Sequence, residues 1–231
     1  MPCTPGSARE RDFSRTRLVV PVEAIHVVVL IPESTRKAKG GEPVAAGTPV
    51  LEDALPRDAR RRLEVLRDQV RAAGPESIGN PAELLPAYRR FCGNMYRAIP
   101  DEAWGLRIPG VEVVMVSGLY GLVASRDPVV GYEVSMAEPV ERLGKLNRWW
   151  HDHGLPVLLR TYLEAVHPDQ VLDILSLEYR EAVEGYASAL RGTKVRRIDF
   201  RGLGRGSQPR RGKLVAKVLR GEPLVKEKDE D

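Results

Sequence analysis

The stretch AIHVVVLIP, residues Ala24 to Pro32, is the strongest indication of the fold class of this chain. It is a nearly unbroken run of aliphatic, mostly β-branched side chains that ends at a proline. Runs without the alternation of a half-exposed strand are typical of strands buried on both faces, as in a parallel sheet. A polar segment with two glycines, ESTRKAKGGEPV, follows directly. The stretch therefore predicts a central strand whose carboxyl end opens into a loop.

Strands and helices alternate along the rest of the chain. GVEVVMVSG at 110–118 and DQVLDILS at 169–176 predict two more strands, and KVRRIDFRG at 194–202 an edge strand or hairpin arm. Leu63, Leu66 and Val70 form one apolar face of a predicted helix at 58–73. Further helices are predicted at 81–99, 140–150, 156–165, 178–190 and 210–221. This order predicts an α/β fold, a single compact domain at 23–220 with a mixed, mostly parallel central sheet flanked by helices.

Composition and the two ends of the chain exclude several protein classes. The 231 residues are 42% apolar, which is typical of a globular protein, and no apolar run approaches the roughly 20 residues of a membrane span. Residues 1–22 lack the apolar centre of a secretory signal and are expected to be a disordered basic leader. Residues 221–231 are expected to be a disordered acidic tail. We therefore expect a cytoplasmic protein with no membrane partner.

Few residues in the sequence have the spacing expected of a metal or cofactor site. Cys3 and Cys92 lie far apart and suggest neither a disulfide framework nor a metal site. HDH at 151–153 is interpreted as a solvated helix end, because no Cys or second His pair accompanies it. The spacing of a phosphate-binding P-loop and that of a nucleophile elbow are both absent. We expect a monomer without cofactor or metal.

Three polar loops follow the three predicted strands: PESTRKAKGG, SGLYGLVASRD and SLEYRE. Ligands of open α/β sheets bind beyond the carboxyl ends of the strands, so the loops are expected to meet at one edge. The expected ligand-binding residues there are Ser34, Lys37, Ser117, Gly118, Tyr120, Gly121, Asp127, Ser176, Glu178 and Tyr179. Lys37 could stabilise an anion, and Asp127 or Glu178 could act as a general base, so catalysis stays an open question. Each residue also fits a purely structural role, such as a helix cap at Ser176 or a turn at Asp127.

The charge of the chain is concentrated near its carboxyl end. Residues 191–220 hold eleven bases and one acid, a net charge of +10, whereas the last eleven residues carry −3. A basic block of this kind favours contact with a polyanion, although a solvated basic surface is an equal alternative. Phe200 is its only aromatic residue, so sequence-specific reading is not indicated. The expected nucleic-acid contacts are Arg196, Arg197, Arg210, Arg211, Lys213 and Lys217.

Taken together, the loops resemble the YaaA family of bacterial peroxide-stress proteins. LIPESTRKAKGG is similar to the loop after the family's first strand, and ILSLEY to a later Leu-Ala-Ser-x-Glu-Tyr motif. SGLYGLVASRDPVVGYEVSM resembles the family's central motif, which adds Tyr132 to the expected ligand-binding residues. RRGKLVAKVL resembles a basic Arg-Gly helix start, and the resemblance runs from about Val27 to Leu219.

The resemblance implies a compact α/β domain with a positively charged cleft. It also implies DNA binding, protection under hydrogen peroxide and lowered free intracellular iron, but no catalytic mechanism. The chain departs from the family pattern at Ala124-Ser125, where Arg-Pro is usual, and at Glu133, where Arg is usual. Two positive charges are therefore expected to be missing from the cleft, which would change its ligand.

Three functions compete on these observations. The first, which we favour, is a peroxide-stress protein that binds double-stranded DNA or another polyanion through a basic cleft. The second is an enzyme that acts on a nucleobase-like or other small polar metabolite in the same cleft. The third is an interaction protein whose loops only cap strands.

Overall fold

A five-stranded sheet forms the centre of the molecule, in the order β4-β3-β1-β8-β9. The computed structural model describes residues 24–44, 48–74, 78–200, 202 and 204–224, so the predicted leader at 1–22 and residues 225–231 of the predicted tail lie outside the described residues. The strands are β1 (Val27–Pro32), β3 (Val111–Ser117), β4 (Gly121–Ala124), β8 (Gln170–Asp173) and β9 (Lys194–Arg197). β3, β1, β8 and β9 are parallel, and only β4 runs against its neighbour. The predicted single α/β domain with a mixed, mostly parallel sheet is confirmed.

β1 is central because its side chains are apolar on both faces. Val28 to Ile31 are fully buried, and β1 pairs with β3 in the register Val29↔Val113 and with β8 in the register Val29↔Leu172. A strand that faces apolar layers on both sides cannot tolerate the polar alternation of a surface strand. The prediction made from the first apolar stretch is therefore confirmed in detail.

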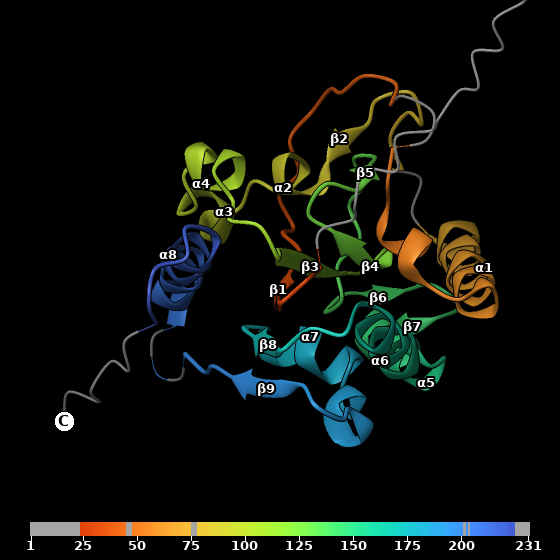
Figure 1. Cartoon of the computed structure of the whole chain (residues 1–231). Coiled ribbons are helices and arrows are strands. Elements are labelled where there is room, and N and C mark those ends of the chain that lie inside the picture. The colour runs from red at the N-terminus through yellow and green to blue at the C-terminus, as the bar shows by residue number, and fades with distance from the viewer. Residues whose placement is uncertain (1–23, 45–47, 75–77, 201, 203, 225–231) are drawn as a thin grey trace, which may run out of the picture.

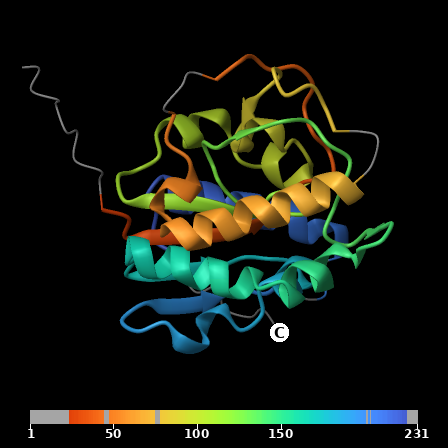
Figure 2. The same cartoon turned by 90° about the vertical axis from the view of Figure 1, so that its right-hand side faces the viewer.

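Helices cover both faces of the sheet (Figure 1). One layer contains α8 (Ser207–Leu219), α3 (Asn94–Arg97) and α4 (Asp101–Gly105). The opposite layer contains α1 (Arg57–Ala73), α5 (Leu146–Asp152) and α6 (Leu155–Val166), and α1 and α6 lie together in front of the sheet in Figure 2. The predicted helices at 58–73 and 156–165 are thus confirmed.

The remaining described elements are shorter. They are η1 (Leu51–Ala54), β2 (Leu85–Pro86), α2 (Ala87–Arg90), β5 (Pro128–Val129), β6 (Pro139–Val140), β7 (Gly144–Lys145), α7 (Leu177–Ala182), η2 (Tyr186–Ala189) and η3 (Gly204–Gly206). The helix expected over 140–150 was wrong in its first half, because β6 and β7 form a small hairpin there. The helix expected over 178–190 ends at Ala182, because Val183 leaves the helical conformation with a φ of −119°, and η2 begins separately after Gly185, whose φ is 88°.

Candidate functional site

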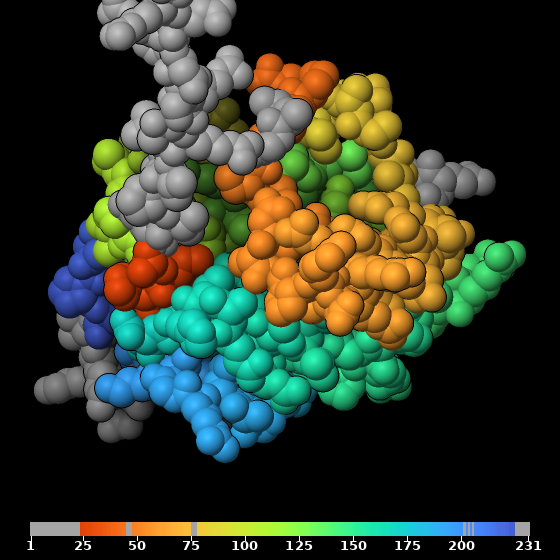
Figure 3. Space-filling model, turned by 45° about the vertical axis from the view of Figure 1, so that its right-hand side comes forward, coloured from red at the N-terminus to blue at the C-terminus, as the bar shows by residue number. Residues whose placement is uncertain are grey.

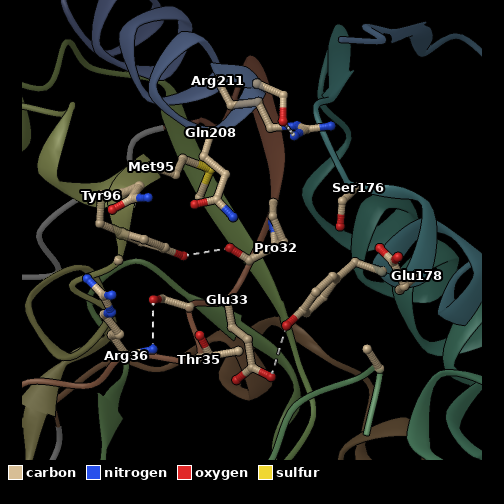
Figure 4. A pocket seen from close by; sticks show the side chains of 16 residues that line it. Pro32, Glu33, Thr35, Arg36, Met95, Tyr96, Ser176, Glu178, Gln208 and Arg211 are labelled. Atoms are coloured by element: carbon tan, nitrogen blue, oxygen red, sulfur yellow. Dashed lines mark hydrogen bonds between the residues drawn. The ribbon is translucent and has the colours of Figure 1, made fainter. Parts of the chain in front are cut away.

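A cavity of about 480 Å³ opens at the carboxyl ends of β1 and β8. Its lining comes from the loop that follows β1, from the start of α3, from the first turn of α7 and from the first turn of α8 (Figure 4). Ligand cavities of open parallel sheets lie at this edge, where adjacent strands lead into different loops. The cavity therefore lies at the edge of the sheet where the sequence predicted the site.

Glu33 lies at the floor of the cavity, and its side chain is 0% exposed. One carboxylate oxygen, Oε1, accepts the N–H of Gly118 at 2.8 Å, and the hydroxyl of Tyr179 lies 3.5 Å from the same oxygen. The other oxygen, Oε2, accepts a hydrogen bond from the Tyr132 hydroxyl and lies 3.8 Å from the Lys37 Nζ. Every described partner is a donor, so the surroundings match a carboxylate that only accepts.

Two backbone features bring these donors to Glu33. Glu33 is the first residue after β1, and Gly118 begins the turn between β3 and β4. A Cβ on Gly118 would lie 3.1 Å from Oε1 of Glu33 and 3.0 Å from the backbone carbon of Ser135. Glycine therefore allows the backbone to approach the carboxylate closely enough to donate.

Lys37 lies behind Glu33 rather than in the cavity lining. Its ammonium donates to the Val134 carbonyl at 3.2 Å and lies 3.9 Å from the centre of the Tyr132 ring. Burial raises the pKa of Glu33 and lowers the pKa of Lys37, and the attraction between the two charges opposes both changes. The two residues form a buried ion pair beneath the cavity floor.

Arginines and polar side chains surround the opening of the cavity. Arg36 is exposed, and Ser34 accepts its backbone N–H at 3.1 Å, which closes the turn after β1. Arg211 donates from Nε to the Ile174 carbonyl at 3.1 Å and from Nη1 to the Ser207 hydroxyl at 2.9 Å. Arg211 is therefore held in place at the start of α8, on the cavity lining.

A stripe of exposed bases continues from this opening along α8. Arg210, Lys213 and Lys217 are exposed, and the spacing of three and four residues places them on one face of the helix. α8 contains no acidic residue, and none of the three bases forms an ion pair with another residue in the described part of the chain. Its opposite face packs against α3, with Gly212 next to the Met95 carbonyl. We call Arg210, Lys213 and Lys217 the α8 basic stripe.

The structure brings together most of the residues expected from the sequence. Ser34, Ser176, Glu178 and Tyr179 line the cavity, as does Arg211, which was expected to contact nucleic acid. A second group surrounds the Glu33 carboxylate instead of the cavity, directly or through Tyr132. It consists of Lys37, Ser117, Gly118 and Tyr132, with the Ser117 hydroxyl 2.7 Å from that of Tyr132.

Tyr120, Gly121 and Asp127 lie away from this cavity, contrary to expectation. The expected loop after β3 is a tight turn into β4, which runs back along β3 and carries Asp127 away from the carboxyl edge. Asp127 accepts the backbone N–H groups of Leu51 at 3.0 Å and Ala124 at 2.9 Å, and with Tyr120 it lines a separate cavity of about 270 Å³. Gly121 has a φ of 67° at the turn. The placement of the three residues at the shared edge was wrong because an antiparallel partner for β3 was not foreseen.

The two departures from the family pattern also lie outside the cavity lining. Ala124 ends β4 and is 8% exposed, and Ser125 donates to Glu112 at 2.9 Å and accepts from Arg107 at 3.2 Å. Glu133 is exposed and is not among the lining residues. The expectation that these positions remove charge from the cleft is therefore not met at this cavity.

The other two expected nucleic-acid contacts lie on the edge strand β9. Arg197 donates to Glu184 at 3.0 Å and lies 3.8 Å from the Asp173 carboxylate, so one exposed and one buried acid neutralise its charge. Arg196 is exposed on the same strand. The basic block of the sequence is thus divided in space between β9 and α8 (Figure 1).

Several lining residues were missed by the sequence interpretation, namely Glu33, Arg36, Asn94, Tyr96 and Gln208. A signal for Glu33 was available, because it directly follows an apolar strand and stands four residues before Lys37. Asn94, Tyr96 and Gln208 come from α3 and α8, which reach this edge only through tertiary packing. No pattern along the sequence marks them.

The described residues contain no group of three or more His, Cys, Asp or Glu side chains that could hold a metal ion. In the HDH segment, His151 lies 3.3 Å from Asp152, and the ring of His153 stacks on Trp149.

The family model described as peroxide stress protein YaaA matches residues 52–225. The chain belongs to the YaaA family. The resemblance inferred from the loops is thereby confirmed, and no curated protein matches the chain. Within the described residues of this YaaA family member, no helix is long and apolar enough to cross a membrane.

Proposed function

We propose that this protein acts in the cytoplasmic response to peroxide stress by binding double-stranded DNA through the α8 basic stripe. The membership in a peroxide-stress family supports the first part of the proposal. The α8 basic stripe supports DNA binding, because its three exposed bases share one helix face that has no acidic residue. Such a surface attracts the phosphate backbone without reading base sequence.

A gel-shift titration of duplex DNA at several salt concentrations tests this function. Each phosphate contact contributes about 0.9 to the slope of log affinity against log salt concentration, so Arg210→Ala/Lys213→Ala/Lys217→Ala should lower the magnitude of the slope by about 2–3. Absence of binding at low salt, or wild-type binding by this variant, would refute the proposal.

The matched control is Arg57→Ala/Arg61→Ala/Arg62→Ala on α1. This variant removes the same net charge from an exposed helix on the other side of the sheet, which Figure 3 shows across the front of the molecule. Equal loss of binding in both variants would mean that net charge, and not the α8 basic stripe, drives the association.

A second function has a specific observation in its favour. Ser176, Glu178 and Tyr179 line the cavity, and the Tyr179 hydroxyl lies 3.5 Å from the buried Glu33 carboxylate. This set of groups suits a small polar metabolite, with Glu178 as the group for acid–base chemistry on it. Thermal-shift screening of metabolites, with Glu178→Gln as the variant, tests this function. If no metabolite raises the melting temperature of the wild type, the second function falls.

A further inference from the structure

The helix α8 ends in a turn that keeps the next residues beside its last bases. Gly221 has a φ of 70°, and its N–H donates to the Val218 carbonyl at 3.0 Å. The N–H of Glu222 donates to the Lys217 carbonyl at 2.9 Å. These two bonds form a Schellman motif, which ends a helix at a glycine in the left-handed region. Glu222 is therefore fixed next to Lys217, the last base of the α8 basic stripe.

Glu222 is the first acid of a segment with a negative net charge. Residues 222–231, which we call the acidic segment, hold five acids and two bases, a net charge of −3. Three of the acids follow one another at 229–231. Among the described residues, the Glu222 carboxylate lies 3.6 Å from the guanidinium of Arg220, the C-cap of α8. The acidic segment thus forms an ion pair with the end of α8 at its first acid, and four more acids follow in the sequence.

The α8 basic stripe has charges that no acid of the described residues neutralises. Arg210, Lys213 and Lys217 are exposed, and within the described part of the chain none of them forms an ion pair. The basic residue Arg197 on β9 differs, because Glu184 accepts from it at 3.0 Å. Like charges three and four residues apart on a helix repel one another. Acids placed over the stripe would relieve this repulsion.

The acidic segment is long enough to cover the stripe. Arg210 and Lys217 are seven residues apart, so the stripe is about 10 Å long at a rise of about 1.5 Å per residue. From Glu222 to Asp229 the chain also advances seven residues, which span up to about 23 Å at about 3.3 Å per extended residue. Residues 229–231 can therefore reach every base of the stripe without any movement of α8.

The covalent connection favours the segment of the same chain over other acidic partners. Leu224 is partly buried against the hydrophobic core, so only a short stretch of chain separates the body of the molecule from residues 229–231. A short linker gives a tethered group an effective concentration in the millimolar range. An acidic peptide in solution, or the same segment of a second copy, would need that concentration to occupy the stripe equally often.

We propose that residues 225–231 dock their acids over the α8 basic stripe and compete with an external polyanion for it. The carboxylates and the phosphates of a duplex neutralise the same three bases, so only one of them occupies the stripe at a time. The competition rests on the proposed DNA function. The docking is a contact within one chain and needs no nucleic acid.

Carbodiimide cross-linking of the full-length protein, followed by mass spectrometry, tests the docking in the absence of DNA. The reagent joins a lysine amine to a carboxylate that contacts it, so Lys213 and Lys217 should cross-link to residues 229–231 at low salt. The yield should fall severalfold at about 1 M salt, where exposed charges are screened within about 3 Å. Lys145, an exposed lysine of β7, is the control and should give no such cross-link. Only protein that remains monomeric on a denaturing gel is analysed, which restricts the result to contacts within one chain.

Neutralising the three consecutive acids tests the competition. Asp229→Asn/Glu230→Gln/Asp231→Asn should bind duplex DNA about three- to tenfold more tightly than the wild type at low salt (about 50 mM). The slope of log affinity against log salt concentration should also become steeper, because DNA no longer displaces an internal anion from the stripe.

The matched control is Asp58→Asn/Glu64→Gln/Glu141→Gln. This variant neutralises the same number of acids at exposed positions of α1 and of the β6–β7 hairpin. It should change the affinity for DNA by less than about twofold, because salt screens exposed charges that lie beyond about 10 Å. An equal gain in both variants would mean that net charge, and not docking of the acidic segment, limits DNA binding.

Absence of the Lys213 and Lys217 cross-links at low salt overturns the inference, whatever the affinity for DNA. Wild-type DNA affinity in the variant at 229–231 overturns it as well. The proposed DNA function would survive either result if the α8 triple variant still lost duplex binding. Conversely, salt-sensitive cross-links in a protein that binds no duplex would remove the DNA function and leave the docking of the acidic segment standing.

Discussion

At the scale of single residues, the molecule depends on a few buried charged groups. Glu33, Asp127 and Asp173 are each at most 5% exposed, and each accepts backbone N–H groups at a place where a strand or turn changes direction. Carboxylates in such positions replace the hydrogen bonds that water would otherwise provide. Asp127, expected as a ligand-binding residue, joins η1 to the end of β4 and thus has a structural role at this position.

Asp127 should make the stability of the fold depend on pH. Burial raises its pKa to about 7, above the value near 4 of an unfolded chain. The folded state then holds this proton more tightly than the unfolded state, so the contribution of Asp127 to stability falls as the pH rises from about 4 to about 7, by up to about 4 kcal/mol. Urea unfolding of the wild type and of Asp127→Asn between these pH values measures the difference. Parallel profiles of the two proteins would contradict the prediction.

The Glu33–Lys37 pair should show strong energetic coupling. Glu33→Gln alone leaves the Lys37 ammonium buried without its anion, and Lys37→Met alone leaves the carboxylate without its cation, so each should lower the free energy of unfolding by about 3–5 kcal/mol. The double variant should cost less than the sum of the two, with a coupling of about 1–3 kcal/mol. Strict additivity in urea unfolding would show that the two charges do not act as a pair.

At the scale of elements, α8 joins the core to the proposed interface. Its inner face packs through Val215, Val218 and Leu219, whereas the α8 basic stripe faces outward. The proposed binding surface is thus held by the same helix that closes one face of the sheet. Changes to the stripe should leave stability nearly unchanged, but changes to the inner face should not.

Gly212 should be intolerant of alanine, although alanine is the better helix former. A Cβ at this position would lie 2.1 Å from the Met95 carbonyl oxygen and 2.9 Å from the Ala98 Cβ, so α8 would have to move away from α3. We expect Gly212→Ala to lower the free energy of unfolding by about 1–3 kcal/mol. Gly105→Ala in α4 is the control, because nothing lies within 4 Å of its added Cβ. Equal effects of the two changes would refute close packing at Gly212.

At the scale of the whole molecule, stability is expected to be greatest at the centre of the sheet. β1 has hydrogen-bonded neighbours on both sides, and its side chains from Val28 to Ile31 are completely buried. Among the described strands, β6 and β7 pair only with each other, and their hairpin projects from the body of the molecule (Figure 2). Local opening is easiest where few apolar contacts hold the backbone.

Hydrogen exchange followed by mass spectrometry should reproduce this order. Backbone amides of Val28 to Ile31 should exchange more slowly than those of any other segment, and those of 140–145 should exchange within the shortest labelling times. The stripe variant Arg210→Ala/Lys213→Ala/Lys217→Ala serves as a control and should leave the pattern in β1 unchanged. Rapid exchange in β1 would contradict a sheet-centred core.

Local patterns along the chain are sufficient to predict the parallel core and the ends of its strands. Unbroken apolar runs at 27–32 and 113–116 have no exposed face, so each required layers on both sides, and polar loops had to follow them. Ser34, Ser176, Glu178 and Tyr179 could be expected at one edge for that reason, because the carboxyl ends of parallel strands coincide.

The set of groups that forms the cavity depends on how distant elements pack against one another. The short GLYG turn sends β4 back along β3, and this reversal depends on pairing with β3, which the apolar pattern alone does not specify. Tyr96 and Gln208 reach the site because α8 packs on α3, a contact between residues more than a hundred positions apart. In the sequence, Glu33 does not differ from the other polar residues of its loop. It lies buried at the cavity floor because Gly118, Tyr132 and Lys37 surround its carboxylate in the folded structure.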